Sequence, residues 1–419
     1  MLICSLQAGP TQLTEDTGSS LTITFPHAKT LVLSDSPLES TAMESFELVN
    51  IDRRQFIAST ASAVAAGYAV NGSSTAEAAA TPTPSGADDA ITALYKSLSD
   101  TQRREVCFGW DERARVVFGQ SVTRDPSGVV LRQHISNTWL ITPHKLGGDF
   151  YTDKQRMLVR DVLHTVFAAG WVDKIIKQAE DDVKKPWGDH QALAIFGQPD
   201  DDRLQCVITG FHLTTRATVD ERSNVAFGGP IAHGHQPSGF YERVGHPGNI
   251  FWYQTVKANE IFRGLDKTQR DRALRKGPMP YYEFDGKIDR TTVTLKTPRY
   301  DRPREHDIRF QAESERPGLP IADMTSDQQA EVHDLIADLL KPYCDAYREQ
   351  VKLCLAAQGG LKSCKLAFYQ QHDLGDDRQW DNWRLEGPSL VWYFRGYPHV
   401  HIWIHVASDA TVSLSSHFG

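Results

Sequence analysis

Apolar residues are spaced in two ways along this chain. Between residues 159 and 166, valine and leucine recur every three or four positions, the spacing of one helix face, and the same spacing returns at 172–183 and 332–339. Other segments, rich in Val, Ile, Thr and aromatic residues, have the period of two that is typical of strands. These predicted strands are residues 191–199, 204–219, 290–298, 388–397 and 399–408.

Four of the expected helices begin with the same polar motif. A Ser, Thr or Asp is followed three residues later by Gln, so that each side chain can bond the backbone N–H of the other residue. Capping chemistry alone converges on this pattern, so its repetition does not indicate an internal duplication. The motifs are Ser99–Gln102, Thr152–Gln155, Asp266–Gln269 and Ser326–Gln329.

The order of these segments predicts the fold class. Helices and strands come in blocks rather than in strict alternation, which favours an α+β fold, with an antiparallel or mixed sheet flanked by helices, over a doubly wound parallel sheet. Residues 81–89 are rich in Pro, Ser and Gly and are expected to form a linker. No second segment of this kind follows, so we expect residues 90–419 to form a single large domain.

A candidate export signal precedes that linker. Arg53 and Arg54 are followed by Phe56 and by a mildly apolar, Ala-rich stretch that reaches Val70, with small residues for cleavage near Ala80. This order is typical of a twin-arginine signal peptide. The stretch is too short and too mildly apolar to span a bilayer. We therefore expect the twin-arginine translocase as a partner, a periplasmic or extracellular location, and no stable membrane span after cleavage.

The position of this signal suggests a later start of translation. A start at Met43 would give a leader of ordinary length. We therefore interpret residues 43–80 as the signal peptide and residues 1–42 as an upstream extension that is wrongly included in the protein sequence. A peptide from residues 1–42 in the immature protein would contradict this interpretation.

Charge and cysteine content narrow the function. The formal net charge of the 419 residues is −8, and most of the excess lies before residue 81, where eight acidic residues face three basic ones. A nearly neutral remainder without runs of Lys or Arg argues against nucleic acid as a partner. The five cysteines after residue 80 are an odd set, although Cys354 and Cys364 could pair.

The candidate chemistry lies near the carboxyl end. In a strand, alternate side chains share a face, so His399, His401 and His405 are expected on one face and the aliphatic residues between them on the other. Two imidazoles two residues apart in a strand can bind one metal ion. Within residues 204–219, the same alternation places His212 on a polar face, where it becomes the natural third ligand.

The loop after that strand supplies further candidates. It is dense in Gly, Pro and His, and it contains His233 and His235 two residues apart, which we include among the candidate metal ligands. Glu221 and Glu242 flank the same loop and are the candidate general bases.

Three functions remain open on these residues. The nucleotide-binding, serine-hydrolase elbow and His-Glu-x-x-His motifs are absent. The first is a metal-dependent enzyme. We expect a zinc-dependent hydrolase of a small molecule, peptide or glycan, or its variant, a copper-dependent oxidoreductase, because three imidazoles suit either ion. A metal-free periplasmic protein that binds glycan or peptide is an alternative from another class. A histidine-lined subunit interface is the third.

Several motifs together resemble a known family. Residues 152–171, "ALAIFGQP", "TGFHLTT", "AFGGP" and "HVHIWIHV", together with the twin-arginine leader, are similar to the uncharacterised bacterial and fungal family numbered 3500 among the domains of unknown function. The resemblance implies a His-His-Leu motif and a later His-x-His motif. Phe211 replaces the first histidine here, so the resemblance carries over His212, His399 and His401, and it implies no established activity.

Overall fold

The computed structural model describes three short strands before residue 35 and most of the chain from residue 81 onward. The described residues are 12–15, 20–25, 29–34, 81–116, 121–235, 246, 248–277, 308–370, 373, 379–396, 399–412 and 414–417. Contacts divide the chain into two units, Met1–Ala79 and Ala80–Gly419. The first unit contains an antiparallel sheet of β1 (Gln12–Glu15), β2 (Ser20–Phe25) and β3 (Lys29–Ser34). The predicted signal segment, residues 43–80, lies outside the described residues.

A mixed sheet of eleven strands forms the centre of the second unit. Its order is β13-β15-β16-β17-β18-β12-β11-β10-β9-β4, with β14 paired to β15. The pairs β4–β9 and β13–β15 are parallel, and the other pairs are antiparallel. The strands are β4 (Cys107–Phe108), β9 (Gln191–Gly197), β10 (Arg203–Gly210), β11 (Leu213–Asp220), β12 (Ile231–His235), β13 (Leu274–Arg275), β14 (Leu319–Pro320), β15 (Lys365–Tyr369), β16 (Asn382–Gly387), β17 (Leu390–Arg395) and β18 (Val400–Val406).

Two small sheets lie beside the large one. One consists of β5 (Arg113–Arg115), β6 (Thr123–Arg124) and β7 (Val129–Val130), and the other pairs β8 (His134–Ser136) with β19 (Ser415–His417).

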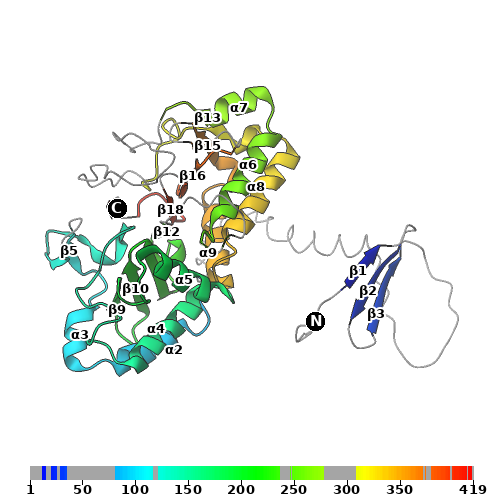
Figure 1. Cartoon of the computed structure of the whole chain (residues 1–419). Helices are drawn as coiled ribbons and strands as arrows, with labels where there is room; N and C mark the ends of the chain where they lie inside the picture. The colour runs from blue at the N-terminus through cyan, green and yellow to red at the C-terminus, as the bar shows by residue number, and fades with distance from the viewer. Residues whose placement is uncertain are drawn as a thin grey trace, which may run out of the picture. The chain divides into compact units, whose positions relative to one another are not determined.

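Two groups of helices flank the large sheet (Figure 1). The first group contacts β10, β11 and β12, and the second lies beside β15, β16 and β18. The first comprises α2 (Ala87–Ser97), α3 (Asp100–Val106), α4 (Asp153–Val166) and α5 (Trp171–Val183). The second comprises α6 (Trp252–Gly264), α7 (Lys267–Ala273), α8 (Ser326–Leu339) and α9 (Asp345–Ala357). Short 3₁₀ turns occur at Leu131–Gln133, Ala226–Gly228, Ile321–Asp323 and Leu361–Ser363.

The main core lies between these helices and one face of the sheet. It contains Val400, Ile402, Ile404 and Val406 of β18 together with the buried residues of the helices. The opposite face carries a smaller cluster around Trp403 and Tyr393. Alternation along β18 therefore separates the aliphatic side chains from the histidines, as the sequence predicts.

The α+β class, the mixed sheet and the flanking helices are confirmed. Three capping boxes are present as predicted, at Ser99, Thr152 and Asp266. The fourth box is Thr325–Gln328, one residue earlier than predicted. Two neighbouring residue pairs fit the motif there, and the structure uses the first.

Three further predictions concern the linker, one strand and one cysteine pair. Thr81 donates its backbone N–H to Glu221 at 2.7 Å, and α2 starts at Ala87, so contacts of the second unit begin inside residues 81–89. The strand predicted at 290–298 lies outside the described residues. Cys354 and Cys364 are both free thiols.

The strand predicted over residues 204–219 is wrong, because the chain reverses in its middle. Strands β10 and β11 are joined by a two-residue turn, Phe211–His212, and Gly210 pairs with Leu213. His212 has a φ of +55°, in the left-handed region that such turns use. The sequence has no Asn-Gly or Asp-Gly at this point, so its apolar alternation continues through the turn without a visible break.

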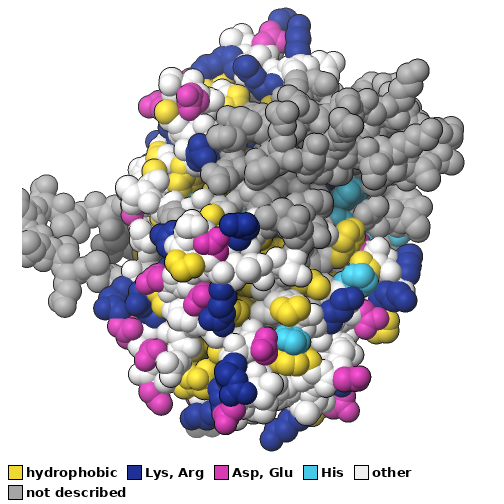
Figure 2. Space-filling model, turned by 90° about the vertical axis from the view of Figure 1, so that its left-hand side faces the viewer, with side chains coloured by type: hydrophobic (Ala, Val, Ile, Leu, Met, Phe, Trp, Pro, Cys, Tyr) yellow, Lys and Arg dark blue, Asp and Glu magenta, His cyan; other side chains and the backbone are white. Residues whose placement is uncertain are grey.

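The surface carries both charges. On the face that Figure 2 shows, Lys and Arg side chains are interspersed with Asp and Glu. Within the described part of the chain, no helix combines the length and the apolar character that a membrane span requires.

Candidate metal centre

Three histidines converge in the middle of the large sheet, where β18, β12 and β11 are neighbours. The Nε2 atom of His399 lies 3.2 Å from Nε2 of His212 and 2.7 Å from Nε2 of His401. One nitrogen from each ring can be chosen so that all three lie within 4.8 Å of one another. Tetrahedral zinc with Zn–N bonds of about 2.05 Å places its ligand nitrogens about 3.3 Å apart. The His212–His399 distance matches this value and the His399–His401 distance is shorter, so the three imidazoles could together hold one ion.

Strand order brings these distant residues together. His401 lies in β18 and His399 just before it, while His212 lies in the turn before β11. Strand β12 separates β11 from β18 and pairs with both, and its Gly234 is the cross-strand partner of His401. A Cβ atom on Gly234 would lie 3.1 Å from Cγ of His212 and 2.6 Å from the carbonyl oxygen of Val400. Glycine at this position therefore leaves the space that the His212 ring occupies.

A buried carboxylate, that of Asp182, accepts a hydrogen bond from Nδ1 of His212, the ring nitrogen that is not in the cluster. The two carboxylate oxygens of Asp182 in α5 accept hydrogen bonds from two imidazoles, Nδ1 of His212 at 2.7 Å and Nδ1 of His235 at 2.6 Å. The Asp182 side chain is only 1% exposed. A proton on Nδ1 of His212 leaves the lone pair of Nε2 for the cluster. This is the carboxylate–histidine arrangement that orients ligands in many zinc sites.

The electrostatics favour neutral rings that can act as ligands. Burial holds the pKa of His399 and His401 well below its ordinary value, and the Arg395 guanidinium lowers both further. Burial also lowers the pKa of His212, although Asp182 opposes that shift. For Asp182, burial alone would raise the pKa, but the two histidines together bring it below the usual value. The surroundings of His399 and His401 thus favour the neutral ring that a metal ligand requires.

A buried cation lies beside the cluster. Arg395 of β17 is the cross-strand partner of His401, so the two side chains share a face of the sheet. Its side chain is almost fully buried. A metal ion at the histidines would therefore sit next to a fixed positive charge.

The structure brings together three of the five predicted ligands. His235 does not reach the cluster but is linked to it through Asp182. His233 lies outside the cluster. Its ring centroid is 5.7–6.0 Å from those of Phe167, Phe251 and Tyr343. Neither ring nitrogen of His233 has a hydrogen-bond partner, and burial lowers its pKa to about 3. Its ring thus lies among aromatic side chains and not in the cluster.

The other candidates have separate positions. His405 shares the face of His401, but its Nδ1 contacts the Ile308 carbonyl at 3.1 Å and its ring stacks on Phe310. Glu221 is exposed and follows the last residue of β11, whereas His212 precedes the first. An eight-residue strand is about 26 Å long, so Glu221 is not brought to the cluster. Glu242 lies outside the described residues.

Sequence reasoning missed Asp182, although a signal was present. Ile175 and Ala179 belong to the apolar stripe of α5, and Asp182 follows them by seven and three residues. These spacings place Asp182 on the buried face of the helix. An acidic residue on the apolar side of an amphipathic helix requires a partner, and it indicates a polar site beneath that helix.

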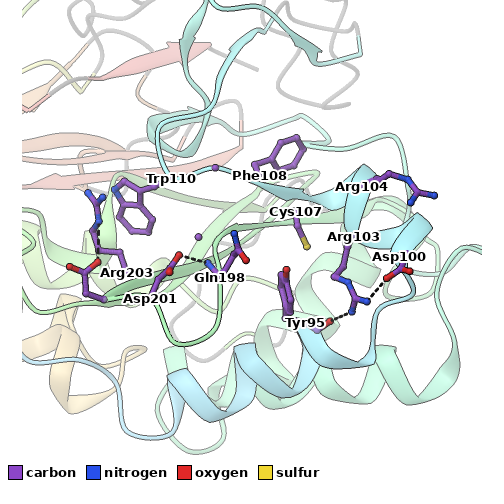
Figure 3. Close-up of a pocket in the computed structure, with 13 residues that line it drawn as sticks. Tyr95, Asp100, Arg103, Arg104, Cys107, Phe108, Trp110, Gln198, Asp201 and Arg203 are labelled. Atoms are coloured by element: carbon purple, nitrogen blue, oxygen red, sulfur yellow. Dashed lines mark hydrogen bonds and ion pairs between the residues drawn. The ribbon is translucent and has the colours of Figure 1, made fainter.

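A cleft of about 550 Å³ lies at the other end of β10 (Figure 3). It is lined by Tyr95, Phe108 and Trp110 and by residues of the turn before β10. Arg203 lies over the Trp110 ring at 5.0 Å and pairs with Asp202, and Arg103 pairs with Asp100. The cleft contains none of the clustered histidines, and its charges are balanced.

Fold and site together define an α+β protein with a buried three-histidine centre supported by a carboxylate. Residues 83–406 match the family described as "Protein of unknown function (DUF3500)", so the chain belongs to this family. Comparison with curated proteins gave no match, and comparison with solved structures gave none either.

Proposed function

We propose that this protein is a zinc-dependent hydrolase whose metal ligands are His212, His399 and His401. The observation that carries the proposal is the convergence of three buried imidazoles, one of them bonded to Asp182. Among the described residues the cluster offers three protein ligands, the number typical of catalytic zinc sites, whereas structural sites have four. A bound zinc ion would polarise a substrate carbonyl or phosphoryl group and lower the pKa of water.

The residues of the chain would have distinct roles in this reaction. Asp182 fixes the tautomer of His212, and Arg395 adds a positive charge beside the ion. Glu242 remains our candidate for the general base. Its exchange for Gln is expected to lower turnover without changing metal content.

The test is metal content, measured by elemental analysis of the full chain. We expect one zinc per chain in the wild type and its loss when His399 and His401 are both changed to Ala. The His405→Ala variant is the matched control, because His405 lies in the same strand and on the same face but outside the cluster. Equal metal content in the wild type and the double variant would overturn the proposal.

A second measurement addresses the chemistry. A panel of chromogenic esters, phosphates and glycosides should include one that is hydrolysed, with activity lost to a chelator and restored by zinc. Copper in place of zinc would indicate the oxidoreductase instead. A zinc-loaded protein that hydrolyses none of the panel would contradict the hydrolase assignment.

We further propose that the protein acts outside the cytoplasm after twin-arginine export. Arg53 and Arg54 and the apolar stretch behind them support this location. Replacing both arginines by Lys is expected to keep the protein in the cytoplasm with its leader uncleaved. Mass spectrometry of the periplasmic fraction would check this, and unchanged export of the Lys variant would contradict it.

A further inference from the structure

A second cleft, of about 710 Å³, lies where α5, α6 and α8 meet. None of the three clustered histidines lines it. This volume is in the range of sites that bind small organic molecules. Its lining combines an apolar wall with four lysines and two carboxylates, whereas the cleft in Figure 3 has equal numbers of acidic and basic residues.

The wall is formed by three partly buried side chains. Trp171 starts α5, Ile250 precedes α6, and Tyr253 lies in its first turn. The Trp171 ring lies 6.2 Å from that of Tyr253, whose hydroxyl donates to the Asp338 carbonyl of α8 at 3.2 Å. The backbone N–H of Ile250 donates to Gln178 of α5. These bonds between elements keep the wall in place without a ligand.

Four lysines surround this wall, and Asp173 and Asp338 are the acidic residues that line it. Lys177, Lys257 and Lys341 each pair with one carboxylate, at 2.5–2.9 Å. Lys174 has no carboxylate within ion-pair distance among the described residues, and its ammonium lies over the Trp171 ring at 4.6 Å. An ammonium has three N–H donors, so even the paired lysines keep donors for a ligand.

We propose that this cleft binds an organic anion, a molecule with an aromatic or aliphatic body and one carboxylate, sulfonate or phosphate group. The body packs on Trp171, Ile250 and Tyr253, and the anionic group faces Lys174. Charge complementarity selects this occupant, because four lysines and two carboxylates line the cleft, which leaves an excess of two positive charges beside the apolar wall. The site is independent of the metal centre.

The probe is 8-anilinonaphthalene-1-sulfonate, whose fluorescence rises in apolar surroundings. Its matched control is N-phenyl-1-naphthylamine, which has the same aromatic body without the sulfonate. We expect the full-length protein to bind the sulfonate in a salt-dependent manner and more tightly than the neutral amine. Exchanging Lys174 or Lys257 for Gln is expected to weaken sulfonate binding about fivefold each, the upper range for an exposed charge pair.

Lys352→Gln is the control variant, because Lys352 is an exposed lysine of α9 that pairs with Glu349 and does not line the cleft. It is expected to bind the sulfonate as the wild type does. Circular dichroism and thermal unfolding verify that each variant is folded. The proposal is overturned if the Lys174→Gln/Lys257→Gln double variant matches Lys352→Gln, or if the neutral amine binds as tightly as the sulfonate.

Discussion

Replacing Asp182 by Asn tests the proposed metal centre without changing a proposed ligand. The exchange preserves side-chain shape but removes the negative charge and one of the two acceptor oxygens. An amide N–H facing Nδ1 of His212 would force the ring proton onto Nε2, which points at the cluster. If the amide faces His235 instead, His212 still loses its charged partner.

The geometry sets the expected size of this effect. Two hydrogen bonds of 2.6–2.7 Å meet on a carboxylate that is almost completely buried. Loss of such a partner behind a ligand costs about 10- to 100-fold in metal affinity, or about 1.4–2.8 kcal/mol. The unfolded chain does not make these bonds, so the metal-free protein is also expected to lose stability.

Competition with a chromophoric chelator for zinc measures this affinity. The control is Asp181→Asn, which changes the neighbouring carboxylate on the same helix. Asp181 is about one-third exposed and pairs with Lys177 at 2.9 Å. We expect Asp181→Asn to bind zinc as the wild type does. If a folded Asp182→Asn variant bound zinc within twofold of this control, the positioning role of Asp182 would be wrong.

Three further predictions concern stability. Gly234→Ala should cost about 1–3 kcal/mol and weaken metal binding, because its Cβ would press on the His212 ring; urea unfolding at wild-type values would contradict this. The pKa of His233 is about 3 in the folded chain but about 6.5 in the unfolded one. The unfolded chain therefore takes up a proton between these values that the folded chain does not, and the free energy of unfolding decreases as the pH is lowered. His233→Phe should therefore lose about 1.6 kcal/mol less stability than the wild type from pH 6.5 to 5, and parallel curves would refute this. Arg216 donates to the carbonyls of Pro230, Arg132 and His134, so Arg216→Lys should cost about 2–3 kcal/mol in urea unfolding, and an unchanged midpoint would contradict its role.

Local periodicity was enough to predict the fold class and two of the three clustered histidines. The alternation in β18 correctly places His399 and His401 opposite the aliphatic residues, because strand side chains alternate whatever the strand pairs with. His212 was identified by the same reasoning, but the strand assumed for it is a hairpin. Its ring reaches the cluster from a turn, not from a strand face.

The rest depends on contacts that local patterns do not contain. Strand order decides that β12 lies between β11 and β18, and so which histidines meet. His233 and His235 alternate as His399 and His401 do, yet one is enclosed by aromatic rings and the other bonds a carboxylate from a helix. Spacing along the chain cannot distinguish these environments, since each is created by residues distant in sequence.

The separation of the ligands along the chain has a consequence for assembly. His212 and His399 are 187 residues apart, and they meet because β12 pairs with both β11 and β18. Contacts of such long range are slow to form, because closing a long loop costs entropy before the contact is gained. An ion could therefore be captured only after both ends of the sheet have docked, and occupancy would report that the polypeptide has finished folding. A nascent chain lacking its last twenty residues could not retain it.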